Sequence, residues 1–407
     1  MNCRHCNKKL EHEFIDLGKA PPSNNYLTNH SLNSPENYFP LRVMVCDNCW
    51  LVQTQDFNDA DELFTDEYAY FSSTSKSFLD HAKDYSTKII DYLGLDEKSF
   101  VVELASNDGY LLKNFYKKNI PCLGIEPTAS TAAASREIGI ETLEEFFGTE
   151  LAMNLSINKK ADLIIGNNVY AHVPDINDFT LGIKELLSSS GTVTLEFPHL
   201  LSLVTNNQFD TIYHEHYSYL SLHAVSEIFK KSGLKVYKVD TLSTHGGSIR
   251  VYGCHINNNK TIDNSYNNLL AKEKAEGIDD INFYKNFNKK AENIKNEFHA
   301  FLIDCKKNNL IVCGYGAAAK GNTLLNYSGV KKDLIKFVCD AAPAKQNKFL
   351  PGSNIPILHP DVLKQENNID YVVIFPWNIA DEVISQLDFL KNKGTKFVKA
   401  IPKLSII

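Results

Sequence analysis

Two pairs of cysteines near the N-terminus place the strongest constraint on how this chain can fold. Cys3 and Cys6 form one Cys-x-x-Cys pair, and Cys46 and Cys49 form a second. Four thiolates from two such turns suit the tetrahedral coordination of Zn²⁺, and they leave no open position for a catalytic water. The spacing therefore predicts a structural zinc site. A redox-active pair or simple buried cysteines are the alternatives.

Length and charge narrow the class of protein. The chain has 407 residues, 43% of them hydrophobic, and a formal net charge of -7. This length predicts two or three domains, and the absence of a long basic run argues against nucleic acid as a partner. No apolar stretch approaches the roughly 20 residues that span a bilayer, and the N-terminus lacks the apolar core of a signal peptide. We therefore expect a soluble cytoplasmic protein with no membrane partner; a monomer is compatible with the sequence.

From about residue 99 the chain alternates short apolar runs with amphipathic helical stretches, which is typical of a parallel sheet with crossover helices. The stretch "SFVVELASNDGYLL" predicts a strand, a turn and a helix, and "CLGIEP" predicts a second strand ending at Glu126. Two more strands follow, in "ADLIIGNNVYAHV" and "GTVTLEFP", and then a hairpin in "GLKVYKVDTLSTHGGSIRVYGC". A sheet that ends in an antiparallel hairpin is typical of S-adenosylmethionine-dependent methyltransferases.

The turn after the first strand distinguishes between two classes of cofactor. It lacks the G-x-G-x-x-G of dinucleotide-binding loops, and its Glu103 and Asp108 would repel a pyrophosphate. A positively charged sulfonium without phosphate suits those acids, so we expect S-adenosylmethionine rather than a nicotinamide cofactor, with Glu126 accepting the ribose hydroxyls. Phe146 and Phe147 could stack on the adenine or belong to the core. The predicted cofactor-binding residues are Glu103, Ala105, Asn107, Asp108, Gly109, Glu126, Phe146, Phe147, Asn167 and Asn168.

A second strand–turn–helix pattern follows a polar helical stretch. "NNLIVCGYGAAAKGNTLLNYSGV" predicts a strand, a turn at Gly314 and Gly316, and a helix, and a later strand ends at Asp340. Free amides at this helix N-terminus, with Lys320 beside them, would suit an anionic phosphate. Alternatively, the glycines only let the helix and strand pack closely.

The predicted fold class is α/β, in four parts. These are a zinc-binding module over 1–75, a class I methyltransferase domain over 76–257, a helical connection over 258–307 and a Rossmann-like domain over 308–407 that contacts a nucleotide sugar.

The order of the motifs resembles a known family. The four cysteines, "ELASNDGYLL", "YHEH", "HGGSIRVY" and "GYGAAAKGNTLL" occur as in the nucleotide-sugar C-methyltransferases of deoxysugar biosynthesis, which include the 3-C-methyltransferase of the tetronitrose pathway. The resemblance covers essentially the whole chain. Ala105 stands where such motifs often carry glycine, which would tighten the cofactor turn. The resemblance implies a TDP-linked 4-keto-6-deoxy sugar as substrate and methylation at ring carbon 3.

The chemistry of such a reaction requires a base. A C–H bond is acidic beside a carbonyl, so a base removes the proton, a second group stabilises the enolate oxygen, and the carbanion attacks the methyl group in line. Histidine is the natural base near neutral pH. The resemblance implies the catalytic residues His216, Glu215, Tyr213 and His172, with an N-terminal tyrosine that is Tyr68 or Tyr70. The predicted substrate-binding residues are Lys320, Asn322, His245 and Asn378.

Each assignment has an alternative. If "YHEHYSYLS" were extended, His214 and His216 would point to one side and Glu215 to the other, as in half of a metal site. Either catalytic histidine could instead be a satisfied core residue. His245 could be a hairpin-turn residue whose glycine neighbours let the backbone approach the sugar, and Lys320 could be an ordinary solvated lysine.

Two other functions also fit the sequence. The same 4-ketone acidifies carbon 5, so methylation there is one alternative. A scaffold that binds a nucleotide sugar without catalysis is the other. In either methyltransferase reading, we expect the branched deoxysugar to decorate a surface polysaccharide.

Overall fold

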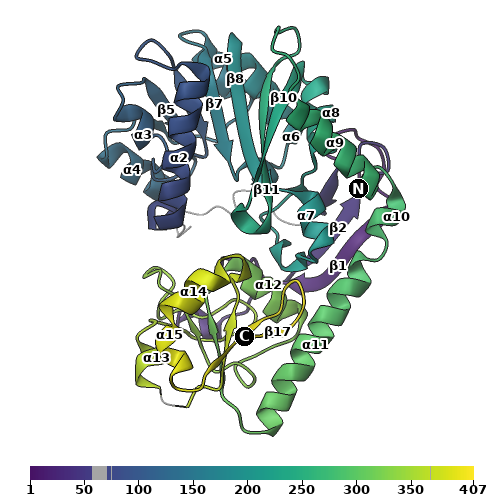
Figure 1. Ribbon diagram of the computed structural model, residues 1–407, viewed down its shortest axis with the longest axis vertical. Coiled ribbons are helices and arrows are strands. Elements are labelled where there is room, and N and C mark those ends of the chain that lie inside the picture. The colour runs from purple at the N-terminus through teal and green to yellow at the C-terminus, as the bar shows by residue number, and fades with distance from the viewer. Residues whose placement is uncertain (57–70, 75, 367) are drawn as a thin grey trace.

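The computed structural model describes residues 1–56, 71–74, 76–366 and 368–407, and these form three β-sheets. The central sheet and the C-terminal sheet stand at opposite ends of the molecule, and the long helix α11 (Phe287–Lys307) runs along one side between them (Figure 1). Strands β1 and β2 of the N-terminal sheet lie at the level where the two ends meet. Within the described ranges, no helix is long and apolar enough to cross a membrane.

The N-terminal sheet is antiparallel, and its last strand comes from far along the chain. Its strands, in spatial order, are β1 (His12–Ala20), β2 (Phe39–Val45), β3 (Val52–Thr54) and β9 (Ser218–Tyr219). The turn between β2 and β3 carries the second cysteine pair. The zinc-binding module predicted over 1–75 did not include β9, because two residues give no strand signal of their own.

The central sheet has the strand order that the closing hairpin predicted. Its order is β10-β11-β8-β7-β4-β5-β6, with neighbours parallel except for β11, which runs antiparallel to both β8 and β10. The bounds are β4 (Val101–Leu104), β5 (Cys122–Ile125), β6 (Thr142–Leu143), β7 (Ala161–Asn167), β8 (Leu187–Pro198), β10 (Leu234–Leu242) and β11 (Ser248–His255).

Helices cover both faces of this sheet, so its inner strands are buried and read as continuous apolar runs. The helices are α2 (Lys76–Leu93), α3 (Lys113–Tyr116), α4 (Ala129–Glu137), α5 (Thr149–Ser156), α6 (Ile176–Leu186), α7 (Leu200–Thr205) and α8 (Leu222–Lys231). The helix predicted after the first turn is the four-residue α3. The polar stretch that follows the hairpin forms α9 (Asn264–Glu276), α10 (Ile281–Tyr284) and α11.

The C-terminal sheet has the order β14-β13-β12-β15-β16-β17, parallel except for β17. Glycines allow its first helix to pack closely: a Cβ on Gly321 would lie 2.8 Å from Phe375, and one on Gly314 would lie 2.5 Å from the same ring. The strands are β12 (Val312–Tyr315), β13 (Val338–Cys339), β14 (Ile357–Leu358), β15 (Tyr371–Ile374), β16 (Lys396–Lys399) and β17 (Ser405–Ile406). The helices are α12 (Ala319–Tyr327), α13 (Val362–Gln365), α14 (Ala380–Gln386) and α15 (Asp388–Lys391).

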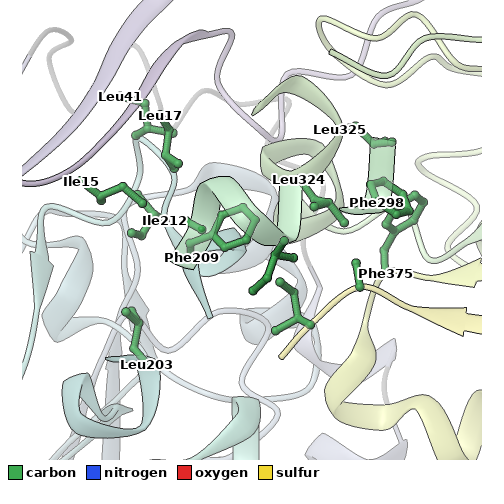
Figure 2. Packing of buried hydrophobic residues seen from close by; sticks show 14 of the residues in the cluster. Ile15, Leu17, Leu41, Leu203, Phe209, Ile212, Phe298, Leu324, Leu325 and Phe375 are labelled. Carbon is green, nitrogen blue, oxygen red and sulfur yellow. The ribbon is translucent and has the colours of Figure 1, made fainter. Parts of the chain in front are cut away.

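One hydrophobic cluster, which we call the junction core, joins the N-terminal and C-terminal sheets to the segment that follows the central strand β8 (Figure 2). It takes side chains from β1 and β2, from α7 and the 3₁₀ turn η4 (Phe209–Thr211), from α11 and from α12. Burying a large apolar side chain contributes about 2–3 kcal/mol, so this cluster holds the two ends of the molecule together. Its labelled members in Figure 2 are Ile15, Leu17, Leu41, Leu203, Phe209, Ile212, Phe298, Leu324, Leu325 and Phe375.

We expect Phe298→Ala to destabilise the protein by about 3–5 kcal/mol, because Phe298 is fully buried in the junction core and truncation leaves a cavity. The measurement is the midpoint of urea unfolding. Glu297→Ala, at an exposed position of the same helix, is the matched control and should leave the midpoint unchanged. Equal midpoints for the two variants would show that the junction core does not determine stability.

Candidate active site

A cavity of about 400 Å³ lies between the carboxyl ends of the central strands and the start of α12. Parallel α/β sheets bind ligands at this edge, where turns from several strands meet. Most of the residues predicted for cofactor, catalysis and substrate line this one cavity. These are Ala105, Asn107, Glu126, Phe146, Phe147, Asn167, Asn168, His172, Tyr213, Glu215, His216, His245 and Lys320.

The cofactor wall is built on Glu126, directly after β5. Its Oε2 accepts a hydrogen bond from the backbone N–H of Asn107 at 2.9 Å, and its Oε1 accepts one from Thr128, also at 2.9 Å. Ala105 and Asn107 both have positive φ, of 54° and 51°. The turn therefore keeps a left-handed backbone at Ala105 although the residue is not glycine, at a cost of about 1–2 kcal/mol.

Several predicted cofactor residues lie behind this wall. Glu103 is fully buried in β4, and burial, with the charges of Glu126 and Asp108, raises its pKa well above the ordinary value. Asp108 accepts a hydrogen bond from the backbone N–H of Ser73 at 3.1 Å, and Gly109 packs against Ser135. Neither acid lines the cavity, so a role of Glu103 and Asp108 in binding the cofactor stays a prediction.

The rest of the wall fits S-adenosylmethionine. Phe147 packs edge-on against Phe179, with ring centroids 5.2 Å apart, while Phe146 is 54% exposed; both line the cavity. The Oδ1 atoms of Asn167 and Asn168 are buried and, among the described residues, have no hydrogen-bond partner. Unsatisfied buried oxygens at a cavity are expected where a ligand supplies the missing donors.

His216 occupies the centre of the opposite wall. Its Nδ1 donates to the carbonyl oxygen of Thr211 at 3.1 Å, which leaves the Nε2 lone pair as an acceptor. The ring lies 4.0 Å from Tyr213 and 4.6 Å from His172, between ring centroids. Burial, and then the nearby His172, lower the pKa of His216 well below its ordinary value. The ring is therefore neutral near pH 7 and can accept a proton.

The "YHEH" segment is a turn rather than an extended strand. The backbone N–H of His216 donates to the carbonyl oxygen of Tyr213 at 3.0 Å. Glu215 and His216 line the cavity, whereas the Nε2 of His214 donates to the carbonyl oxygen of Phe39 at 3.3 Å, outside the cavity lining. The extended arrangement that would pair the two histidines is wrong. In the described part of the chain, the four N-terminal cysteines form the one cluster able to hold a metal.

Two more histidines approach the same space. Burial lowers the pKa of His172, in the turn η3 (Tyr170–His172), to about 4. His245 has a φ of 54° and packs edge-on against Phe78 at 5.5 Å; burial, with the charge of Lys320, lowers its pKa to about 4. Both are neutral near pH 7.

The glycines of "HGGSIRVY" pack closely against side chains from other parts of the chain. A Cβ on Gly246 would lie 2.3 Å from the ring of Trp377, and one on Gly247 would lie 2.5 Å from the Oγ of Ser202. Both have positive φ. Gly246 therefore allows a close contact between the hairpin and Trp377, and the expectation that these glycines let the backbone approach a sugar stays a prediction.

The C-terminal residues divide into one that lines the cavity and two that do not. Lys320 lines it, donates to the Oδ1 of Asn378 at 2.7 Å and lies 4.6 Å from the centroid of the Trp377 ring. Burial lowers the pKa of Lys320, so a fully solvated lysine is the wrong interpretation. Asn378 therefore anchors Lys320. Asn322 is buried and donates to the carbonyl oxygen of Ser23 at 2.6 Å, which removes it from the predicted substrate site.

Sequence reasoning missed three side chains at this site. Asn24, which follows β1, lines the cavity and donates through Nδ2 to both carboxylate oxygens of Glu215. Lys345 lines the cavity and donates to the carbonyl oxygen of Ala317 at 3.0 Å. Asp210 lies beneath the site and accepts a hydrogen bond from the Nε1 of Trp377 at 2.7 Å. No motif marked them. Tyr68 and Tyr70 lie outside the described residues.

The four cysteine sulfurs fit a single zinc ion. They lie within 4.8 Å of one another, with Cys3–Cys49 and Cys6–Cys46 separations of 3.5 Å. Sulfurs about 2.3 Å from a tetrahedral Zn²⁺ would lie at comparable separations. None of the four cysteines lines the cavity.

Three family models match the chain. Residues 3–64 match a putative zinc binding domain, residues 78–239 a methyltransferase domain, and residues 243–402 the C-methyltransferase C-terminal domain. C-methyltransferase NovU from Streptomyces niveus is 32% identical over 408 residues, an alignment that covers 100% of this chain and 96% of that protein.

Two solved structures resemble part of the chain. An S-adenosylmethionine-dependent methyltransferase from Clostridium acetobutylicum is 14% identical, with a TM-score of 0.35 over 42% of this chain and 90% of that one. Magnesium protoporphyrin IX methyltransferase from Synechocystis PCC 6803, with bound S-adenosylmethionine, is 11% identical, with a TM-score of 0.36 over 50% of this chain and 100% of that one. Both TM-scores lie below 0.5.

We expect Glu126→Gln to weaken S-adenosylmethionine binding about tenfold, because an amide offers one acceptor oxygen where the carboxylate offers two, and charge-assisted hydrogen bonds are the stronger kind. Isothermal titration calorimetry gives the dissociation constant. Glu145→Gln, an exposed carboxylate at the same cavity, is the matched control. Unchanged affinity in the Glu126 variant would remove that residue from the cofactor site.

Proposed function

Because this chain belongs to the C-methyltransferase family, we propose that it transfers the methyl group of S-adenosylmethionine to carbon 3 of a TDP-linked 4-keto-6-deoxy sugar. The observation that carries this proposal is the neutral His216, which shares a cavity with the cofactor wall. Its Nδ1 is paired with Thr211, and its Nε2 has no backbone partner among the described residues. A base of this kind is what abstraction of a proton beside a ketone requires.

His216 performs the proton transfer. Its Nε2 accepts the proton from carbon 3, while the Nδ1–H bond to the carbonyl oxygen of Thr211 holds the ring in the required tautomer. That bond also stabilises the imidazolium that forms. Its lowered pKa keeps the ring unprotonated at neutral pH, so every molecule begins the cycle with the base available.

Lys320 suits the charge that develops on the substrate. Removing the proton places negative charge on the ketone oxygen, and a preorganised cation in a water-poor cavity stabilises such a charge strongly. Asn378 and Trp377 hold the Lys320 ammonium at this wall. The nearby Lys345 would meet the diphosphate of the nucleotide sugar, since it also lines the cavity. Bound S-adenosylmethionine supplies the electrophilic methyl group.

The alternatives are separated by the product. A 4-ketone acidifies carbons 3 and 5 alike, so methylation at carbon 5 uses the same residues. A non-catalytic scaffold does not suit a member of an enzyme family. We expect incubation with S-adenosylmethionine and a panel of nucleotide 4-keto-6-deoxy sugars to convert the TDP-linked substrate, and NMR to place the new methyl on carbon 3. A methyl on carbon 5, or no conversion of any sugar, would contradict the proposal.

We expect His216→Asn to lower methyl transfer by about 10²–10⁴-fold, because asparagine cannot accept the proton. Exchange of the carbon 3 proton with deuterated solvent should be lost in parallel, and the affinity for S-adenosylmethionine should stay unchanged. His214→Asn is the matched control, because that ring points away from the cavity toward Phe39. Proton exchange at the parent rate in the His216 variant would eliminate it as the base.

A further inference from the structure

We propose that Asn24 is a positioning residue of the active site, which holds the carboxylate of Glu215 beside the base His216. The N-terminal segment would thereby contribute a residue to a site that also takes residues from the central and C-terminal parts of the chain. The inference rests on the proposed function, because it places Glu215 on the substrate side of the cavity.

The contact between the two side chains is direct and symmetric. The Nδ2 of Asn24 lies 2.9 Å from Oε1 and 2.8 Å from Oε2 of Glu215. Both residues line the cavity, and Glu215 is 2% exposed. An amide N–H donates but cannot take up the proton of a carboxyl group, so this contact favours the carboxylate form. A carboxylate at this depth requires such a donor, because an unpaired buried charge is costly.

The position of Asn24 is itself fixed by the C-terminal part of the chain. The carbonyl oxygen of Ser23 accepts from the Nδ2 of Asn322 at 2.6 Å, and the Tyr26 hydroxyl donates to the carbonyl oxygen of Ala317 at 2.6 Å. Leu27 exchanges two backbone hydrogen bonds with Phe349, at 2.9 and 2.8 Å. Residues on both sides of Asn24 in the sequence are therefore hydrogen-bonded to the C-terminal part of the chain. These bonds fix the backbone from which the Asn24 side chain extends.

The turn of "YHEH" explains why this contact matters for catalysis. Glu215 and His216 are adjacent in the turn and face the same cavity. A shift of the Glu215 carboxylate would therefore displace the groups around the base His216 or change the charge near it. A displacement of about 1 Å at a reacting group can cost about 100-fold in rate. Among the described residues, the other titratable or charged side chains near this contact are His172, His216, His245, Tyr213, Lys320, Lys345 and the nearby Tyr26.

The decisive variant is Asn24→Asp, which places a second carboxyl group against Glu215. Two carboxylates in contact must share a proton, so the pair should act as one unit with a raised macroscopic pKa. Above the pKa of that shared ionisation, we expect kcat/KM of this variant to fall about tenfold per pH unit. The pH profile of the parent protein should lack this falling limb. The KM for S-adenosylmethionine should be unchanged. Asn24→Ala should lower kcat about 100-fold at every pH.

Asn322→Ala is the matched control for a merely structural role. It removes the hydrogen bond to the carbonyl oxygen of Ser23, which anchors the same segment, and leaves the side chains of Asn24 and Glu215 in place. We expect it to lower the thermal unfolding temperature and to leave the shape of the pH profile unchanged. If Asn24→Asp lowered activity equally at all pH values, as a purely structural defect would, the positioning role would be overturned.

A double-mutant cycle separates this proposal from the proposed function. Asn24→Ala, Glu215→Gln and the double variant are compared in urea unfolding, which requires no substrate. We expect the two effects to be non-additive, because each variant removes the same contact. Additive effects would overturn the contact itself. If the parent converts no sugar in the panel while the cycle shows coupling, the proposed function fails and the hydrogen bond between Asn24 and Glu215 stands.

Discussion

Burial of apolar surface in the junction core is the constraint on which the site depends. Phe209 and Ile212 immediately precede the "YHEH" turn, and Leu324 and Leu325 belong to the helix that begins beside Lys320. The packing that joins the sheets therefore also sets the spacing between the base and the C-terminal cation. The walls of the cavity come from different parts of the molecule, so its shape depends on how firmly those parts are held together. They are held by a close-packed apolar core rather than by a polar interface.

Desolvation is the second determinant, and it favours the neutral form of several buried groups around the site. Burial lowers the pKa of His172 and His245 to about 4 and raises that of Asp210 to about 6. Each shift favours the neutral form. Keeping these polar groups neutral lowers the free-energy cost of burying them while no substrate is bound. In the same water-poor surroundings, the electric field of a remaining charge such as Lys320 is stronger.

The features that the sequence predicted correctly are those that depend on local pattern and on the order of motifs. Strands, the cysteine cluster and the arrangement of motifs follow from local pattern and spacing, and the central sheet has the predicted closing hairpin. The features that it did not predict have a common cause. The direction of His214 depends on a turn closed by one backbone hydrogen bond, and the burial of Glu103 depends on neighbouring strands. Asn24 meets Glu215 across 191 positions of sequence, and no periodicity encodes such a contact.

Strand β9 has a consequence for how the protein is made. Its residues Ser218 and Tyr219 pair with β3, so the N-terminal sheet lacks its fourth strand until more than half of the polypeptide has left the ribosome. A nascent chain could bind zinc at its two cysteine turns early, yet β3 would remain an open edge during synthesis of the central sheet. Such edges invite pairing with other chains. Elongation speed over the intervening stretch, rather than the stability of the finished fold, would then govern how much of the protein reaches its native state.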